Sequence, residues 1–470
     1  MRRKGLALSS GGQLQGRHGA YRLLVLMLIA MLVMVGCSDE QEPVKQPDEL
    51  KVADWDENNF NILYGDYLNS FYPNTSIQFI STGTASDYQV STEEQTRRWK
   101  QLLEQEQPDL VVIRDNSTYR FLADAGLLTD LSPYMQSSGI TDEQIHPGVL
   151  ELMKQNRDGL PYGMATGFLA SMLYYNADLF QEYGIDLPHD GMTWEEVLHL
   201  ANRFTSASES KDGPIGYYEP YSGPVELANR IGGTEGLSMY RIGTRRMTID
   251  TSAWKQVLHT ILSYYKDGTF RSIVPKGKVN ADGMEYYDQA ATASADLFGQ
   301  GKAAMTTNSY GAFDASKVSF KLGAVNAPVD SATRLRSNGF NANVKLAVRA
   351  GSPKAQAAWN FIQFMTSDYV AKISIQQMTN FGLPVRLSYA QVTKDDSAAD
   401  LYKQMPAITP PDDYMAVDLS FYDNLNSMLK REIGDVLADN QTEETMLKRM
   451  QKQGQQLLDT AKARGKEQKK

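Results

Sequence analysis

Polar and aromatic side chains follow three apolar segments of the chain, and these side chains could bind a small ligand. They are Trp55, Asp56, Glu57, Asp115, Asn116 and Tyr221. Carboxylates and amides can form hydrogen bonds with ligand hydroxyls, and an aromatic ring can pack on an apolar ligand face. Polar residues after strands also turn the chain in any α/β protein, and Tyr221 could equally be a core residue. These residues alone leave both interpretations open.

The sequence lacks the motifs of most metal-dependent and nucleotide-dependent enzymes. Its histidines are scattered, and it contains neither a Gly-Lys-Ser/Thr phosphate loop nor a Gly-x-Ser-x-Gly elbow. Asp54, Asp56 and Asn58 have the spacing of a calcium loop, but Asn59 and Gly65 occupy the positions that require Gly and Glu. We therefore expect no metal and no cofactor. A carboxylate pair for glycoside hydrolysis stays possible, because the separation of two carboxylates in space is not visible in a sequence.

Strands and helices alternate in the part of the chain that carries the first two groups of side chains. The patterns predict strands at 50–55, 76–80 and 110–113, and amphipathic helices at 60–71 and 93–107. This alternation is typical of an α/β fold with a mainly parallel sheet. Ligands of such sheets bind beyond the carboxyl ends of the strands, which is where these polar groups lie.

Length and charge narrow the possible architectures and partners. A chain of 470 residues is too long for one compact core, so two or three domains or lobes are expected. The net charge of −9 argues against nucleic acid as a partner. The single cysteine excludes an intramolecular disulfide.

Residues 1–36 have the features of a signal peptide. A basic stretch without acidic residues precedes the apolar run 23–35, which is shorter than the ~20 residues that span a bilayer. The run ends in Met-Val-Gly before Cys37, which resembles the lipobox of bacterial lipoproteins and implies that Cys37 is lipidated, for example with palmitate. A buried structural cysteine is the alternative. Residues 37–48 are polar and contain proline, so we predict a flexible linker.

The strongest family signature lies in the segment 173–204. It begins Leu-Tyr-Tyr-Asn-Ala-Asp-Leu-Phe and continues to Thr193 and Glu196, whose spacing is that of a helix capping box. Together with the segments 122–131 and 298–309, it resembles the family 1 extracellular solute-binding proteins. These are the receptors of bacterial ABC importers for sugars, and maltose-binding protein is their best-known member.

The resemblance implies a two-lobed fold of the periplasmic-binding-protein type. Each lobe would be a mainly parallel sheet flanked by helices. The N-terminal lobe would comprise residues 49–163 and 340–392, and the C-terminal lobe residues 164–339 and 393–470. A few residues at the crossings between lobes would act as hinges when the lobes close on a ligand.

The resemblance also implies a ligand site between the lobes. The Glu-Pro-Tyr sequence that ends at Tyr221 is similar to a family segment whose tyrosine stacks on a sugar ring. The loops after the first and third predicted strands match loops that bind sugar hydroxyls. Tyr310, with Phe313 as its alternative, and Phe421 match positions where the family presents aromatic rings, although core packing is the other interpretation of Phe421.

The function implied is that of a lipid-anchored receptor on the extracellular face of a bacterial membrane, of the Gram-positive type. It would bind a carbohydrate, such as an oligosaccharide, as a monomer and deliver it to an ABC permease without catalysis. Two other functions fit the same features. One is an extracellular carbohydrate-active hydrolase, and the other is a receptor that reports its ligand to a membrane sensor kinase. The residues do not determine which sugar is bound.

Overall fold

The structure is a computed structural model that describes residues 46–461 with short gaps. The gaps are residues 87–89, 91, 208–212, 274, 276, 281–284, 343, 378–381, 393–395, 409–416 and 418. The predicted signal peptide, Cys37 and most of the predicted linker lie outside the described residues. Within the described part of the chain, no helix is long and apolar enough to cross a membrane.

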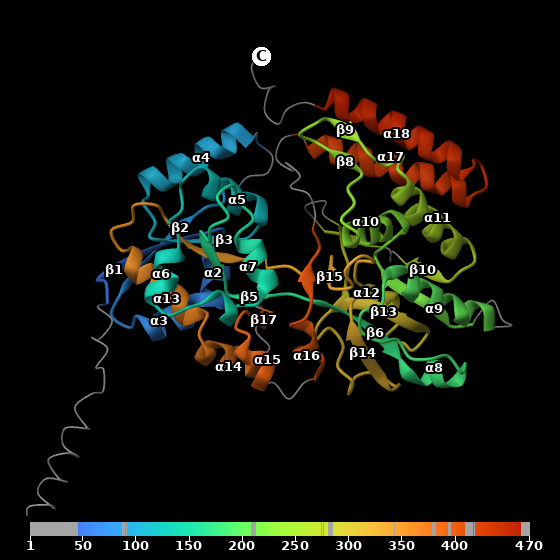
Figure 1. The fold of residues 1–470 in the computed structure, drawn as a ribbon, viewed down its shortest axis with the longest axis horizontal. Coiled ribbons are helices and arrows are strands. Elements are labelled where there is room, and N and C mark those ends of the chain that lie inside the picture. The colour runs from blue at the N-terminus through green and yellow to red at the C-terminus, as the bar shows by residue number, and fades with distance from the viewer. Residues whose placement is uncertain are drawn as a thin grey trace, which may run out of the picture. The chain divides into compact units, whose positions relative to one another are not determined.

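Five strands form the first sheet, in the order β2-β1-β3-β16-β4 (Figure 1). Their bounds are β1 Glu49–Asp54, β2 Ser76–Ser81, β3 Leu110–Ile113, β4 Gly163–Ala165 and β16 Lys345–Val348. The first three pair in parallel, as the alternation of strands and helices predicts, whereas β16 is antiparallel to both of its neighbours. All four residues of β3 are buried, because helices cover both faces of such a sheet.

The helices around this sheet come from two separate parts of the chain, and we call the sheet with these helices the first lobe. They are α2 Glu57–Phe60, α3 Asp66–Phe71, α4 Thr92–Gln105, α5 Asn116–Asp124, α6 Ser132–Ser137, α7 Pro147–Met153, α13 Ala355–Met365, α14 Asp368–Gln377 and α15 Ser388–Val392. A π-helical turn, Asn61–Gly65, joins α2 to α3. The helix predicted at 60–71 is therefore present, but its first half is π-helical.

The second sheet contains the order β10-β7-β13-β6-β14. Its strands are β6 Ser171–Asn176, β7 Ile215–Pro220, β10 Phe270–Ile273, β13 Ala303–Ser309 and β14 Leu322–Asn326. Strands β10, β7 and β13 run parallel, whereas β6 is antiparallel to β13 and β14. The two sheets confirm the expected α/β class, and in each of them three neighbouring strands on one side run parallel.

Helices from two distant parts of the chain pack around the second sheet, and together they form the second lobe. They are α8 Ala177–Glu182, α9 Trp194–Ala207, α10 Pro224–Thr234, α11 Ser252–Lys266, α12 Gln289–Ala295, α17 Leu419–Leu437 and α18 Glu443–Thr460. The capping box before α9 is confirmed: the Thr193 N–H donates to Glu196 at 2.8 Å, and the Glu196 N–H donates to the Thr193 hydroxyl at 3.3 Å. Helices α17 and α18 pack side by side (Figure 1).

The chain passes from the first sheet to the second after β4 and returns before β16. These two crossing segments pair with each other, because Leu169 and Asn341 exchange backbone hydrogen bonds of 2.8 and 2.9 Å. The rings of Phe168 and Phe340 stack beside this pair with centroids 4.9 Å apart. Strand β4 spans the boundary that we predicted at residue 163 and belongs to the first sheet.

Short paired strands complete the described fold. Strand β5 Gly167–Phe168 pairs with β17 Leu383–Pro384, and β15 Arg336–Ser337 pairs with β18 Met405–Pro406. The remaining short strands, all in the second lobe, are β8 Tyr240–Arg241, β9 Arg246–Met247, β11 Lys278–Val279 and β12 Glu285–Tyr286. Helix α16 Asp396–Leu401 packs on β14.

Candidate functional site

A buried ion pair lies at the carboxyl ends of β1 and β3. Asp54 is fully buried, and its carboxylate accepts hydrogen bonds from the Nε and Nη2 atoms of Arg114 at 2.8 and 2.6 Å. The Trp55 N–H adds a third hydrogen bond of 2.7 Å to the same carboxylate. Such bidentate pairing compensates the desolvation of a buried charge and fixes the orientation of both groups. Because the Arg114 side chain remains 26% exposed, it can also contact a ligand.

A cavity of about 290 Å³ lies beside this ion pair. Its walls combine aromatic and aliphatic surface with hydroxyl, carboxylate and guanidinium groups, and include Asp54, Trp55, Trp99, Arg114, Asp115 and Thr118. Trp55 is 48% exposed, so this ring lies where the cavity meets solvent. A mixture of apolar walls and a few polar groups is typical of small-molecule sites.

Two helices begin at this edge of the first sheet, and a carboxylate caps each of them. Asp56 accepts a hydrogen bond from the Asn59 N–H at 2.8 Å, and Asp115 accepts one from the Thr118 N–H at 2.8 Å. Helix N-termini attract anions, but here the protein's own carboxylates already occupy both. Glu57 is exposed in the first turn of α2.

A buried lysine contacts the first residue of α5. The Nζ atom of Lys345 donates to the Asn116 side-chain oxygen at 2.5 Å and to the Ala342 carbonyl at 2.8 Å, and it lies 4.9 Å from the centre of the Tyr119 ring. Burial lowers the pKa of Lys345 to about 7, although the charge of Asp115 opposes this shift. Lys345 thus connects the returning crossing segment to the start of α5.

Tyr221 lies at the corresponding edge of the second sheet, directly after β7. Its N–H donates to the Ile273 carbonyl at 3.0 Å, and its φ of 58° is in the left-handed region, which is uncommon for a tyrosine. Its ring is 39% exposed and makes an edge contact with Tyr287, with centroids 5.2 Å apart. Tyr221 is therefore accessible to a ligand. Its backbone conformation is of a kind that clusters at functional sites.

A buried carboxylate supports the segment before Tyr221. Glu219 is 3% exposed and accepts hydrogen bonds from Thr307 at 2.5 Å and from Tyr217, and it forms an ion pair with Arg230 at 2.8 Å. Burial raises the pKa of Tyr217 well above its usual value, and the neighbouring Glu219 charge acts in the same direction. The Arg230 side chain is 37% exposed. The second sheet thus repeats the arrangement of the first, with a buried carboxylate holding a partly exposed arginine.

Two other predicted aromatic residues occupy different surroundings. Tyr310 follows β13, its N–H donates to the Ala170 carbonyl at 2.9 Å, and its partly buried ring packs against a core cluster that contains residues of both sheets. Phe421 is only 3% exposed and packs on the rings of Tyr240 and Tyr422, with centroids 5.4 and 5.2 Å away. The structure therefore places Phe421 in the core of the second lobe, the other interpretation given above, and we do not include it in the site.

Sequence reasoning did not identify the two arginines. Arg114 lies one residue before the predicted Asp115, and Arg230 lies on α10, in the segment after Tyr221, where we predicted no side chain as a ligand contact. Polar residues that follow an apolar run would have included Arg114. Nothing in the local pattern around Arg230 shows that it reaches Glu219, which lies eleven positions earlier in the chain.

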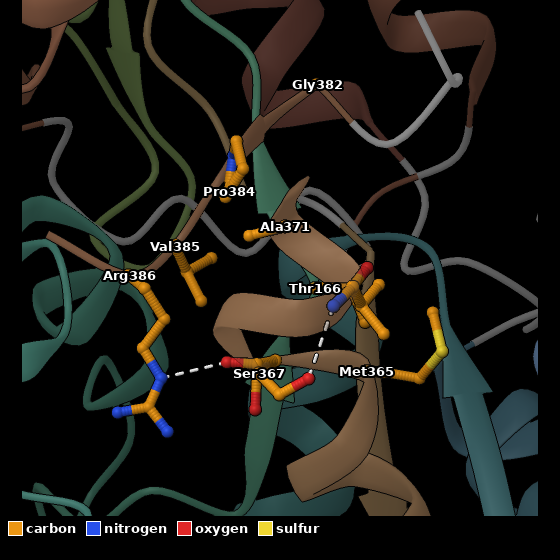
Figure 2. A pocket seen from close by; sticks show the side chains of 10 residues that line it. Thr166, Met365, Ser367, Ala371, Gly382, Pro384, Val385 and Arg386 are labelled. Atoms are coloured by element: carbon orange, nitrogen blue, oxygen red, sulfur yellow. Dashed lines mark hydrogen bonds between the residues drawn. The ribbon is translucent and has the colours of Figure 1, made fainter. Parts of the chain in front are cut away.

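The described residues provide neither a metal centre nor, in the hollow of Figure 2, room for a ligand of this kind. Among the described residues, no group of three or more His, Cys, Asp or Glu is placed to hold a metal ion. Figure 2 shows a small hollow of the first lobe, where Arg386 donates to the Thr366 carbonyl at 2.8 Å and the Val370 N–H donates to the Ser367 hydroxyl at 3.3 Å. Its volume of about 10 Å³ accommodates about one water molecule.

Similar structures establish the fold. The family 1 extracellular solute-binding protein of Alicyclobacillus acidocaldarius matches with a TM-score of 0.63, at 15% identity over 89% of this chain and 100% of that protein. The sugar-binding protein MalE of Xanthomonas citri matches with a TM-score of 0.59, at 14% identity over 87% of this chain and 97% of MalE. At these identities the likeness shows the two-lobed solute-binding fold and no more.

Similar sequences are named as sn-glycerol-3-phosphate-binding periplasmic proteins UgpB. The protein from Brucella melitensis is 22% identical over 317 residues, which cover 65% of this chain and 67% of that relative. The protein from Rhizobium meliloti is 21% identical over 217 residues, so the chain spans less than half, 45%, of that relative's length. A sequence model of the bacterial extracellular solute-binding proteins matches residues 56–372. The chain therefore belongs to the bacterial extracellular solute-binding protein family.

Proposed function

We propose that the protein is a lipid-anchored, extracellular receptor of an ABC importer that binds an uncharged carbohydrate between its lobes. The observation that carries this proposal is the matching chemistry at the two sheet edges. Each edge presents an exposed aromatic ring, Trp55 or Tyr221, within two residues of a buried carboxylate that binds a partly exposed arginine. A sugar has apolar C–H faces and hydroxyl edges, so a site for it needs both kinds of contact.

Charge at the first-lobe cavity favours an uncharged ligand over a phosphate ester. The carboxylates of Asp54 and Asp115 outnumber the one guanidinium of Arg114, so the charged groups that line the cavity sum to −1. The two helix N-termini at this edge are already capped by carboxylates. A phosphate would meet repulsion here, which distinguishes the proposed ligand from the sn-glycerol 3-phosphate named for the UgpB relatives.

Closure of the lobes on the ligand would complete the site. Each lobe contributes its own ring and arginine, and a ligand shifts an open–closed equilibrium only through its preference for the closed form, ~5.5 kcal/mol for a change from 1:99 to 99:1. We propose that the crossing segments around Leu169 and Asn341 act as the hinge. The two lobes would have approximately the residue ranges that we predicted from the sequence. The closed monomer would then dock on the membrane subunits of the permease.

Calorimetric titration of the mature protein tests the proposal. The ligands are maltose, maltotriose, D-mannitol and sn-glycerol 3-phosphate. We expect a neutral sugar or polyol to bind and the phosphate ester to bind at least tenfold more weakly. Binding of the phosphate ester alone would contradict the charge argument. Turnover of chromogenic glycosides would favour the hydrolase instead.

Tyr221→Ala is expected to weaken binding of that ligand ten- to a hundredfold. The substitution removes an exposed ring that would cover one face of the sugar, and central aromatic residues of interfaces typically contribute at least ~2 kcal/mol. The matched control is Tyr369→Ala, which removes a ring that is 64% exposed on α14. Equal affinity of the Tyr221 variant and the parent would show that the site is misplaced.

Cys37 provides the test of anchoring. Metabolic labelling with palmitate is expected to mark the full-length protein and to leave a Cys37→Ser variant unlabelled, because no other cysteine exists. The variant should then leave the membrane fraction. Labelling of both proteins would contradict the proposed lipid attachment.

A further inference from the structure

Two buried polar groups in the wall of the first-lobe cavity have no hydrogen-bond partner among the described residues. They are the indole Nε1 of Trp99 and the hydroxyl of Thr118, on side chains of residues that are 1% and 2% exposed. Buried polar groups nearly always have a partner, so each unpaired group requires an explanation.

The other buried tryptophans show what is usual in this chain. The Nε1 atom of Trp359 donates to the Ser138 hydroxyl at 2.8 Å, and that of Trp254 donates to the Ser238 carbonyl at 3.0 Å. Trp194 likewise donates to the Thr234 hydroxyl, at 3.2 Å. Trp99 differs from these three, and it is also the buried tryptophan that lines the cavity beside Asp54 and Arg114.

The neighbouring carboxylates are already engaged. Both oxygens of Asp54 accept hydrogen bonds from Arg114, and Asp115 caps α5. The unpaired groups are therefore a donor on Trp99 and a hydroxyl on Thr118, neither of which carries a charge. A ligand that matches them offers neutral oxygen atoms, as the hydroxyl and ring oxygens of a sugar do.

We propose that this cavity is an end-recognition subsite, which takes one terminal ring of the carbohydrate. This inference rests on the proposed function and specifies the binding mode at the same site. The volume of about 290 Å³ is at the lower limit of ligand pockets, ~300–1,000 Å³, so a single ring fits and a longer chain must extend out past Trp55. Oxygens of the terminal ring accept hydrogen bonds from Trp99 and Thr118 as small shifts of the wall bring these groups into contact.

Trp99→Phe and Thr118→Val test this subsite, with Trp359→Phe as the matched control. The first two remove an unpaired N–H or hydroxyl and keep most of the side-chain volume. We expect each to weaken binding of maltose or maltotriose about tenfold, and binding of the acyclic D-mannitol alone would overturn the subsite. We expect Trp359→Phe to leave the affinity unchanged and to lower the melting temperature of the ligand-free protein more than Trp99→Phe does, because only Trp359 loses a hydrogen bond.

The outcomes separate this inference from the proposed function. If Tyr221→Ala weakens binding while both cavity variants bind like the parent, the subsite is overturned and the receptor function stands. If Trp99→Phe weakens binding only as much as Trp359→Phe does, the effect is structural and the subsite is again overturned. If the parent binds none of the four ligands, the proposed function fails, and the subsite with it.

A cyclic ligand provides an independent measurement. A cyclic glucan such as cycloalternan has no terminal ring, so end recognition predicts at least tenfold weaker binding than that of the linear oligosaccharide maltotriose. The protein from Listeria monocytogenes, similar in fold at 18% identity, is described in complex with cycloalternan, which makes this sugar a practical probe. Equal or tighter binding of the cyclic sugar would overturn the subsite.

Discussion

Gly216→Ala is expected to destabilise the protein by about 3 kcal/mol or more and to remove ligand binding with it. Gly216 lies in β7 against α9, and an added Cβ would lie 2.1 Å from the Ala201 carbonyl oxygen. The clashing atom belongs to the backbone, so no rotamer change relieves the contact, and the cost is expected at or above the upper end of the ~1–3 kcal/mol that is typical of overpacking. Because β7 leads directly to Glu219 and Tyr221, its displacement would also disturb the site.

Urea denaturation of the ligand-free protein measures this effect. Gly243→Ala is the matched control, because a Cβ there meets nothing within 4 Å and its backbone is outside the left-handed region. The control should unfold like the parent, within ~0.5 kcal/mol. A Gly216 variant that is as stable as the control would mean that α9 and β7 are further apart than the structure shows.

Lys345→Met is expected to stabilise the protein most at low pH and progressively less toward pH 10. The pKa of Lys345 is lowered from 10.5 to about 7 in the folded state by burial. Between these values the unfolded chain binds more protons, so this lysine makes the stability of the parent rise with pH. Below pH 7 the full penalty of the buried charge applies, and above pH 10.5 it is absent.

The difference in unfolding free energy between Lys345→Met and the parent should shrink by about 4 kcal/mol from pH 7 to pH 10, at ~1.4 kcal/mol per pH unit. The difference is the quantity to measure, because the other titrating groups are common to both proteins. Lys317→Met, at a side chain that is 80% exposed, should show no such trend. A pH-independent difference for Lys345→Met would contradict the buried charge.

The same substitution should weaken ligand binding. Lys345 holds the side chain of Asn116 and therefore the start of α5, which carries Asp115. A variant that is more stable yet binds less well is the usual result when a charge is retained for the benefit of a site. Titration of the variant with the ligand found for the parent measures this directly.

Local sequence patterns predicted much of the fold, because they report local physical preferences. The capping box at Thr193 and Glu196 forms with both of its expected hydrogen bonds. The apolar run 110–113 is a fully buried strand. Even so, the same patterns gave no sign of the π-helical turn at 61–65, because its apolar residues still repeat at helical spacing.

The candidate site was only partly visible in the sequence, because its charged groups depend on contacts between distant residues. Asp54 and Arg114 are sixty positions apart and meet only when β1 pairs with β3. Lys345 stands in an apolar strand, where a lysine would ordinarily reach toward solvent, and its burial follows from the neighbours that the sheet supplies. Phe421 has the spacing of a helical core residue, and local pattern alone could not separate that role from ligand contact.

The paired backbone of Leu169 and Asn341 limits how the two sheets can move relative to each other. Two backbone segments that are joined by a pair of hydrogen bonds cannot slide past one another without breaking these bonds. They can bend and twist together at little cost. The stacked rings of Phe168 and Phe340 hold the same register from one side. The motion that this pair allows is therefore a bend or twist of the two paired segments together, and substitutions there should change the equilibrium between open and closed forms more than the intrinsic affinity of the site.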